Sequence, residues 1–330
     1  MEILQTIDFF FSDFINPKKR VFVGYLGLAL IIALAWLVLF QRGNLRSALR
    51  KIFDPKVFFS KSATIDYAIF LLNRVLALIL APLLLSQLAI STAIYFALVG
   101  SDWLSLGQFA GLGKGWVIAL FTIAIFLGDD FSKYLLHRWM HRWPLLWAIH
   151  KVHHSAETLT PLTVYRVHPL EGILYTTRGT IVQGVIIPIF LFLFSEGINL
   201  YTIAGVNVFT FVFHVTGSNL RHSHVDIHYW RWLERVLISP AQHQVHHSLA
   251  EEHYDKNFGA TLALWDWIFG SLHLSKAGDE LNFGLREDEN LNSGSLKAMY
   301  ISPMTEMGRI IVRNALRVGQ AGITRIVNRR

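Results

Sequence analysis

The sequence predicts an all-α integral membrane protein with a histidine-rich site for two metal ions. Apolar residues make up 53% of the 330 residues, and the mean hydropathy is positive. These residues gather in long blocks, which is typical of bilayer-spanning segments rather than of a soluble core. Several of the 15 histidines recur at helical spacing. Together these features favour apolar helices that carry a polar, metal-binding cap.

The clearest predicted span is the uncharged run 21–40. As a helix it would extend about 30 Å, the thickness of one hydrocarbon core. Lys18-Lys19-Arg20 precede it and no small-residue cleavage site follows, so we expect a retained helix rather than a signal peptide. Three further regions complete about four transmembrane helices or hairpins. They are 75–99, as one span or as a hairpin broken near Pro82; the short run 115–128; and a hairpin near 181–213, with runs 181–194 and 199–213 separated by Ser195-Glu196-Gly197.

Charge predicts the orientation of these segments. The segment 41–64 contains six Lys or Arg residues and one acid, which places it in the cytoplasm by the positive-inside rule. The weakly charged loop 100–114 then lies outside, and the histidine-rich stretches on either side of 181–213 return to the cytoplasmic face. We therefore expect a cytosolic helical cap. The absence of cysteine and of a targeting signal indicates a bacterial inner membrane.

Three regions follow from this pattern. Residues 1–114 form an N-terminal transmembrane region, and 115–275 form the catalytic domain. Residues 276–330 comprise an acidic loop and a basic amphipathic helix. That helix carries Arg309, Arg313 and Arg317 at i, i+4 spacing, which suits the surface of an anionic leaflet or, alternatively, a solvated terminal helix. The net charge of +7 is interpreted as membrane attraction, and no nucleic-acid-binding motif occurs.

The histidine spacing predicts metal binding. His137 and His141 are four residues apart, and the pattern HxxHHS occurs twice. Residues at i, i+3 and i+4 share one face of a helix, so each repeat directs three rings to one side. The repeats are His150, His153 and His154, and His243, His246 and His247. By contrast, His168, His253 and His273 fit ordinary polar residues, and His228 fits either reading.

The residue types and motifs that are missing from the sequence limit which metal ions it can bind. The chain has no cysteine, which excludes thiolate sites and iron–sulfur clusters. One ion takes four to six ligands, so eight clustered rings imply two ions. No HExxH motif of a hydrolytic zinc enzyme occurs, and a ring-rich site with open positions favours iron and O2. A haem-binding electron-transfer protein is the alternative, although adjacent pairs such as His153-His154 exceed what one haem needs. A metal transporter or sensor would place its ligands within the spans.

These motifs resemble the fatty acid hydroxylase / sterol desaturase superfamily of membrane di-iron oxygenases. HRWMH (137–141), HKVHH (150–154) and HQVHH (243–247) match its boxes, and the stretch LERVLISPAQHQVHHS is similar to the alkylglycerol monooxygenase-like and bacterial branches. The resemblance covers roughly 120–275. It implies a non-haem di-iron centre at the cytosolic face, O2 as oxidant, and hydroxylation or desaturation of a lipid alkyl chain or sterol.

The resemblance also implies the ligands. All eight box histidines would bind metal, joined by a middle histidine for which His222 is the nearest match, His224 a close rival and His214 a more distant one. Asp130, Asn257 and Asp266 would orient ligand rings, although Asp266 alternatively anchors the WDWIFG turn. Zinc could replace iron in a purified sample. Because no flavin, NAD or haem segment is found, electrons would come from a cytochrome b5-, ferredoxin- or pterin-type donor.

Overall fold

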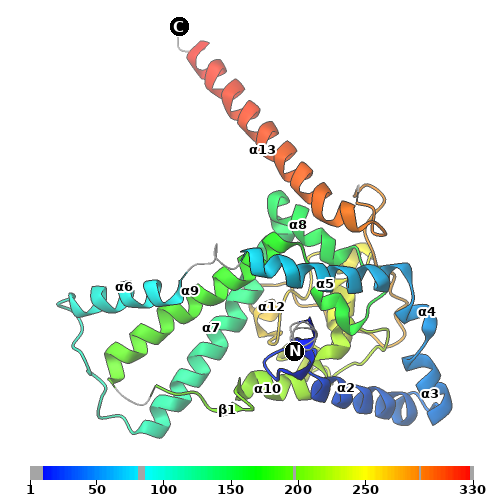
Figure 1. Cartoon of the computed structure of the whole chain (residues 1–330), viewed down its shortest axis with the longest axis horizontal. Coiled ribbons are helices and arrows are strands. Elements are labelled where there is room, and N and C mark those ends of the chain that lie inside the picture. The colour runs from blue at the N-terminus through cyan, green and yellow to red at the C-terminus, as the bar shows by residue number, and fades with distance from the viewer. Residues whose placement is uncertain (1–9, 81–85, 196–197, 290, 328–330) are drawn as a thin grey trace, which may run out of the picture.

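The computed structural model describes residues 10–80, 86–195, 198–289 and 291–327, and the side chains of these up to residue 317. It is mainly helical (Figure 1). Within these described residues, four helices are long and apolar enough to cross a membrane. They are α2 Val23–Ala35, which continues as the π-helical η1 Trp36–Phe40, α5 Lys61–Leu80, α7 Lys114–Arg142 and α9 Pro169–Phe194.

Shorter elements connect these helices. Before α7 come α3 Leu45–Ile52, α4 Pro55–Phe58 and the apolar α6 Gln87–Val99. Between α7 and α9 lie α8 Pro144–His154 and the 3-10 helix η3 Pro161–Tyr165. After α9 follow the antiparallel pair β1 Thr202–Ile203 and β2 Val206–Asn207, then α10 Val208–Val215, η4 Ser218–His222, η5 Leu233–Arg235, α11 Pro240–His246, η6 Glu251–His253, α12 Leu264–Ile268 and α13 Leu296–Val327.

The first predicted span is confirmed. The second predicted region, 75–99, is divided between the end of α5, which already begins at Lys61, and the shorter helix α6 Gln87–Val99. The predicted break at Pro82 lies outside the described residues. The charged residues of α5 argue against a membrane span, but two of them have partners far away in the sequence. Asp66 accepts from Arg166 at 2.8 Å, and Arg74 pairs with Asp13 at 2.7 Å. Because these charges are neutralised in the fold, the helix tolerates them.

The predicted hairpin near 181–213 is wrong in form. One helix, α9, occupies 169–194, and the return is short and mostly non-helical. This return follows α7: Thr122 Oγ1 accepts from the Tyr201 backbone at 2.9 Å, and the Thr122 carbonyl accepts from Asn207 at 3.0 Å. The side chains of Phe126 and Phe209 also contact each other, at 5.1 Å between centroids. Backbone groups at membrane depth thereby find partners within the protein.

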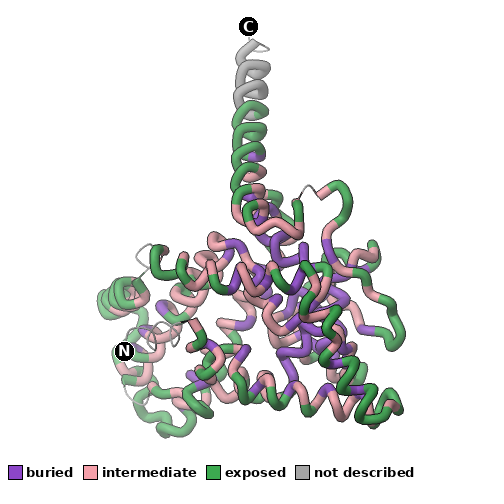
Figure 2. Tube along the Cα trace, turned by 45° about the vertical axis from the view of Figure 1, so that its right-hand side comes forward, coloured by how far each residue is buried: buried purple, intermediate pink, exposed green. Residues whose placement is uncertain are grey.

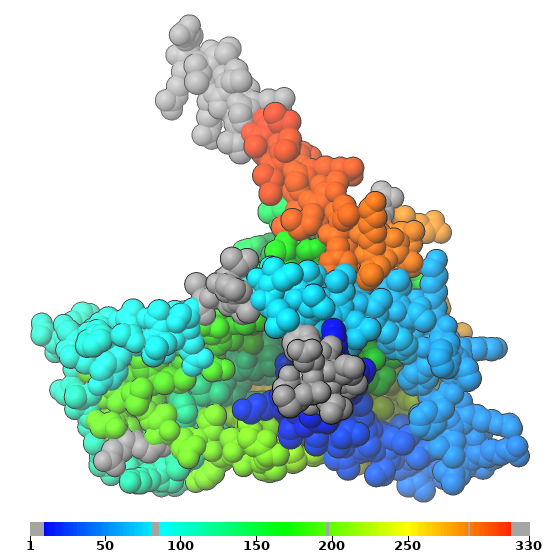
Figure 3. Space-filling view, in the orientation of Figure 1, coloured from blue at the N-terminus to red at the C-terminus, as the bar shows by residue number. Residues whose placement is uncertain are grey.

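The helices gather into two parts. In Figure 1, α6, α7 and α9 lie together, and α9 packs on both neighbours. The second part contains the short elements: α8 packs on α7, α11 packs on η4, and α12 contacts α7 through Trp265 and Phe131. Buried residues are concentrated there, whereas α13 becomes exposed beyond its base (Figure 2). The predicted basic helix is α13, which begins at Leu296. Figure 3 shows it projecting clear of the body, so it contacts the rest of the molecule mainly through its first turns.

Candidate metal centre

Four short segments carry the clustered histidines. The end of α7 presents His137 and His141, and α8 begins at once with Pro144 at its first turn, where proline needs no amide hydrogen. On α11, Ser239 and Gln242 form a capping box, and Pro240 occupies the first turn. Local sequence thus starts α8 and α11 at a defined residue, which sets the direction of the rings three to ten residues later.

Nine histidines converge into two compact groups. The first contains His137, His141, His150, His154 and His246; the second contains His153, His222, His243 and His247. Within each group, one ring nitrogen of every residue lies within 4.8 Å of the others. The groups adjoin, because the rings of His154 and His247 stack at 4.5 Å between centroids. Residues about 90 positions apart therefore form one site.

Hydrogen bonds fix the rings of the first group. The Nδ1 atom of His137 donates to the Phe258 carbonyl at 2.8 Å, and that of His246 donates to the Lys256 carbonyl at 2.8 Å. His150 Nδ1 donates to the Glu171 carboxylate at 2.9 Å. This leaves Nε2 free to bind an ion, the usual arrangement of metal-binding histidines. The Nε2 atoms of His150 and His246 are buried with no partner among the described residues.

In the second group, ring nitrogens of three histidines approach one another directly. His222 Nε2 lies 3.2 Å from His153 Nε2 and 3.0 Å from His243 Nε2. Two nitrogens bound at about 2.1 Å to one ion lie about 3.0 to 3.4 Å apart, depending on geometry. The spacing therefore fits a shared metal ion. Because three rings meet at their Nε2 atoms, hydrogen bonds between the rings alone cannot satisfy all of them.

Electrostatics favours neutral rings. Burial, and then repulsion from neighbouring rings, holds five pKa values well below that of free imidazole: those of His153, His154, His222, His243 and His247. Burial also lowers the pKa of His246 to about 3. Neutral imidazole is the form that binds metal. The donor set thus fits two metal ions held mainly by nitrogen.

The three residues predicted to orient ligand rings contact the backbone around the cluster instead of the rings themselves. Asp266 accepts from the backbone of Phe258 and Gly259 at 2.8 and 2.7 Å, and so holds the peptide that contacts His137. Asp130 accepts from the backbone of Thr261 and Leu262. Asn257 donates to the Gln242 carbonyl at 3.1 Å. Each anchors the loop 257–273, and none hydrogen-bonds to a ring of the cluster.

Glu171 is the ring-orienting acid that sequence reasoning did not single out. Its side chain is 2% exposed and contacts His150. Its sequence signal was ambiguous, because an acid in the first turn of α9 is already explained by the helix dipole. The carbonyls of Phe258 and Lys256 carry no sequence signal at all.

The structure does not bring His224 to the cluster, which corrects its place among the predicted ligands. Its Nε2 donates to the Lys51 carbonyl at 2.6 Å, because the chain leaves η4 at the extended residue Ser223. His214 contacts Ser218, and His228 contacts Ser275. The remaining histidines, His168, His253 and His273, also lie outside both groups.

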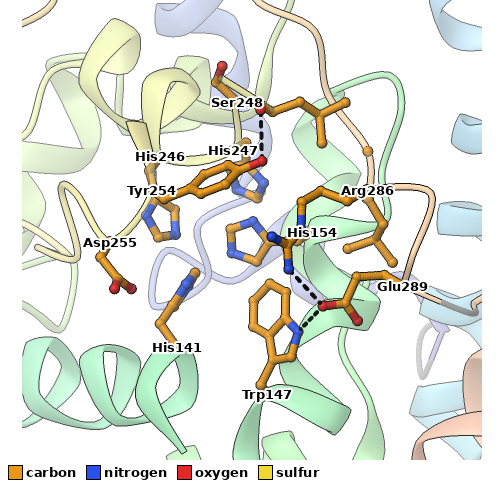
Figure 4. A pocket seen from close by; sticks show the side chains of 13 residues that line it. His141, Trp147, His154, His246, His247, Ser248, Tyr254, Asp255, Arg286 and Glu289 are labelled. Atoms are coloured by element: carbon orange, nitrogen blue, oxygen red, sulfur yellow. Dashed lines mark hydrogen bonds and ion pairs between the residues drawn. The ribbon is translucent and has the colours of Figure 1, made fainter. Parts of the chain in front are cut away.

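A cavity of about 310 Å³ opens onto the first group (Figure 4). His141, His154, His246 and His247 line it. Opposite them, Glu289 accepts from Trp147 at 2.9 Å and lies 3.7 Å from Arg286. The metal-facing rings are therefore reached from a polar side that the loop around residues 284–289 partly covers.

Comparison with known proteins identifies the domain. Residues 122–271 match the family model for fatty acid hydroxylase. This part of the chain is similar to the fatty acid hydroxylase superfamily. The domain contains all nine clustered histidines, and with four apolar helices the chain is an integral membrane protein.

The domain is similar to several curated proteins. Alkylglycerol monooxygenase of Homo sapiens is 29% identical over 50% of this chain and 33% of its own length. A Delta(7)-sterol 5(6)-desaturase of Eremothecium gossypii is 33% identical over 48% and 39%. An ornithine lipid hydroxylase of Rhizobium tropici is 26% identical over 48% and 43%. The chain thus spans less than half the length of each relative. No solved structure matches it significantly.

Proposed function

We propose that the chain is a membrane-bound non-haem di-iron oxygenase, an oxidoreductase that uses O2 to hydroxylate or desaturate an alkyl group of a lipid or sterol. One observation carries the proposal: in each of two adjoining groups of histidines, one ring nitrogen of every residue lies within 4.8 Å of the others. The relatives are named for monooxygenation, hydroxylation and desaturation, and these activities favour oxidation of a lipid.

Each group would hold one iron ion. In the first, His137, His141, His150, His154 and His246 would be ligands; in the second, His153, His222, His243 and His247. When bound, the irons supply O2 activation sufficient to oxidise an unactivated C–H bond. The protein keeps the rings neutral, orients three of them through Glu171 and two carbonyls, and excludes bulk water by burial.

The remaining assignments rest on this proposal. Residues 115–275 form the catalytic domain, 1–114 the N-terminal membrane region and 276–330 the C-terminal region. The site faces the cytoplasm of a bacterial inner membrane, where a cytochrome b5-, ferredoxin- or pterin-type donor supplies electrons. Zinc can occupy the same nitrogen ligands in a purified sample. The substrate is a membrane lipid or sterol, and nucleic acid is not a partner.

The haem alternative is less well supported. A haem iron takes one or two axial ligands, one on each side of a wide macrocycle. Here nine rings contact one another, for example His137 and His246 at 4.5 Å and His222 and His243 at 4.5 Å between centroids. Rings this close leave no space for a macrocycle between them. An optical spectrum with a Soret band would reverse this judgement.

The decisive experiment compares two neighbouring histidines. Purified protein is expected to bind two iron ions per chain by elemental analysis, with no Soret band. The His222→Ala variant should lose about one ion, whereas His224→Ala, two residues away, should keep both. Lipid profiles of cells with and without each variant should then show an oxidised lipid only when both ions are retained. Equal metal loss in the two variants, or none in either, would contradict the assignment.

A further inference from the structure

A second cavity lies beside η4, away from the polar cavity of Figure 4. It measures about 330 Å³ and lies between α2, α3 and η4. Its walls are almost entirely apolar, with Leu26, Ile52, Phe58, Leu220 and Val225 among the side chains that line it. None of its lining residues lines the polar cavity. Among the described residues, the apolar cavity adjoins the cluster only through η4, which carries His222 of the second group.

Three polar side chains interrupt this apolar wall, and two of them, Ser223 and His224, already hydrogen-bond to backbone carbonyls. The third is Asn219. Asn219 is 2% exposed and lines the cavity. Neither its amide oxygen nor its amide nitrogen has a hydrogen-bond partner among the described residues. Buried amides are nearly always hydrogen-bonded, because an unpaired one loses its interactions with water without compensation. An unpaired amide on a residue in the wall of an apolar cavity points to a ligand with a polar group.

Asn219 also lies close to the metal site. Both Asn219 and His222 belong to the 3-10 helix η4, where residues i and i+3 lie one above the other, about 6 Å apart along the axis. His222 directs its Nε2 to His153 and His243. A group held by Asn219 is therefore about one helical turn from the second histidine group.

The cavity reaches the surface of a predicted span. Val23 of α2 and Phe53 after α3 line it, and they are 60% and 55% exposed. Because α2 is one of the helices suited to cross the membrane, its exposed face meets lipid. An apolar molecule can thus enter from the bilayer without crossing water.

We propose that this cavity binds the alkyl portion of the lipid substrate, with Asn219 hydrogen-bonding to a hydroxyl or carbonyl group of that lipid. This inference rests on the proposed function and adds the substrate subsite to it. The apolar wall binds the chain by burial, and the amide fixes its depth. The depth selects which carbon faces the second histidine group, and the polar cavity remains open to solvent and the electron donor.

Photolabelling of the full-length, metal-loaded protein tests the proposal without requiring turnover. The protein is placed in phosphatidylcholine nanodiscs that contain, in separate samples, a phosphatidylcholine or a sterol bearing a diazirine on its apolar part. Labels on exposed residues of α2 report bulk lipid. Labels on residues 219–225, most of which are buried, report a molecule inside the cavity. We expect such labels from at least one probe, and the probe that gives them identifies an acyl chain or a sterol as occupant.

Matched glycine variants test the route. Gly27 lines the cavity on α2, and an added Cβ would meet nothing within 4 Å. Gly27→Phe should fill the entrance and reduce labelling of 219–225 by about tenfold. Gly179 on α9 has equally open surroundings but lies outside the cavity, so Gly179→Phe should leave the labelling unchanged. Absence of label at 219–225 with both probes, or equal labelling in the two variants, would overturn the proposal.

The amide is tested separately. Asn219→Leu removes two unpaired polar atoms at similar volume, so the free protein should melt at the same or a higher temperature. The same variant should shift the crosslinks along the probe or weaken them, because the depth is no longer fixed. A lower melting temperature with unchanged crosslinks would show that Asn219 is structural. Iron content is measured in each sample, so failure of the iron site remains distinguishable from failure of the subsite.

Discussion

At the residue scale, small backbone differences decide which histidines can bind metal. Gly217 adopts φ 99°, a left-handed conformation that glycine tolerates, and this directs η4 toward the cluster. His222, at the end of η4, meets His153 and His243. His224 follows after one extended residue and contacts the backbone of α3 instead. Because the two histidines are two residues apart, the sequence alone could not tell which one binds metal. The backbone conformation between them directs only His222 to the cluster.

Glu171 allows a direct test of ring orientation. Because its carboxylate fixes the ring of His150, Glu171→Ala should lower metal affinity by about 10- to 100-fold, and Glu171→Gln should recover part of the loss. Elemental analysis after dialysis against a graded chelator measures this. Glu251→Ala is the control, since Glu251 is exposed and contacts no ring of the cluster. Unchanged affinity in Glu171→Ala would show that His150 needs no such support.

Asp266 makes a pH-dependent contribution. Burial raises its pKa to about 6 from a usual value near 3.8. A raised carboxyl pKa means that the folded state binds the proton more tightly, so the contribution is fully present below about pH 3.8 and is lost as the pH rises through about 6.

The expected outcome is a pH-dependent difference between two melting curves. Relative to Asp266→Asn, the wild-type protein should lose stability between about pH 4 and pH 6, by up to about 3 kcal/mol. Thermal unfolding in detergent across this range measures the difference. A constant difference between the two proteins would show that Asp266 titrates alike in the folded and unfolded states.

At the element scale, α8 and the α11 segment each contribute two histidines to one group and the third histidine to the other group. On α8, His150 and His154 at i, i+4 join the first group, while His153 turns to the second. In the α11 segment the i, i+4 pair, His243 and His247, joins the second group, while His246 turns to the first. This reciprocal arrangement explains why the HxxHH pattern occurs twice. Neither helix can complete a group without the other, so the site depends on their contact.

A buried lysine connects this arrangement to α13. Lys151, between the histidines of α8, lies 2.8 Å from Glu289 and 2.5 Å from Glu306. Lys151→Met keeps the side-chain bulk but leaves two carboxylates facing each other. We expect about 1–3 kcal/mol of destabilisation, less than for a fully buried pair because Glu306 is a third exposed.

Two measurements check the link to α13. The Lys151→Met variant should melt earlier, and trypsin should cut the arginine-rich α13 faster. Lys276→Met is the matched control, because Lys276 is exposed and lies outside α13, so that the trypsin sites of the helix are unchanged. Equal cleavage rates in the two variants would contradict an anchoring function of Lys151.

At the scale of the whole molecule, the loops at the two ends of the long helices should lie on opposite sides of the membrane. The basic segment before α5 and the loop before α7 are separated by a candidate span. The chain has no cysteine, so single-cysteine variants give an unambiguous signal. In intact cells an impermeant maleimide should label Ser105→Cys but reach Ser47→Cys only after lysis. The reverse result would place the histidine cluster outside.

The sequence was sufficient to predict several features. The uncharged run 21–40 predicted its helix, because local hydropathy and length suffice for a span. The spacing of His137, His141 and the two HxxHH motifs predicted shared helix faces, because i, i+3 and i+4 neighbours are set by helix geometry alone. Composition excluded thiolate and iron–sulfur chemistry. Each of these features depends on residues within a few turns of one another.

Tertiary structure decided the rest, because it depends on partners far away in the chain. The charges of Asp66 and Arg74 argued against a span that begins at residue 61. In the fold, Arg166 and Asp13 neutralise these charges. The choice between His222 and His224, the support of His150 by Glu171, and the unpaired amide of Asn219 all follow from long-range packing. Hydropathy and helical spacing are local properties, whereas neutralising a charge or closing a metal group requires segments that only the folded chain brings into contact.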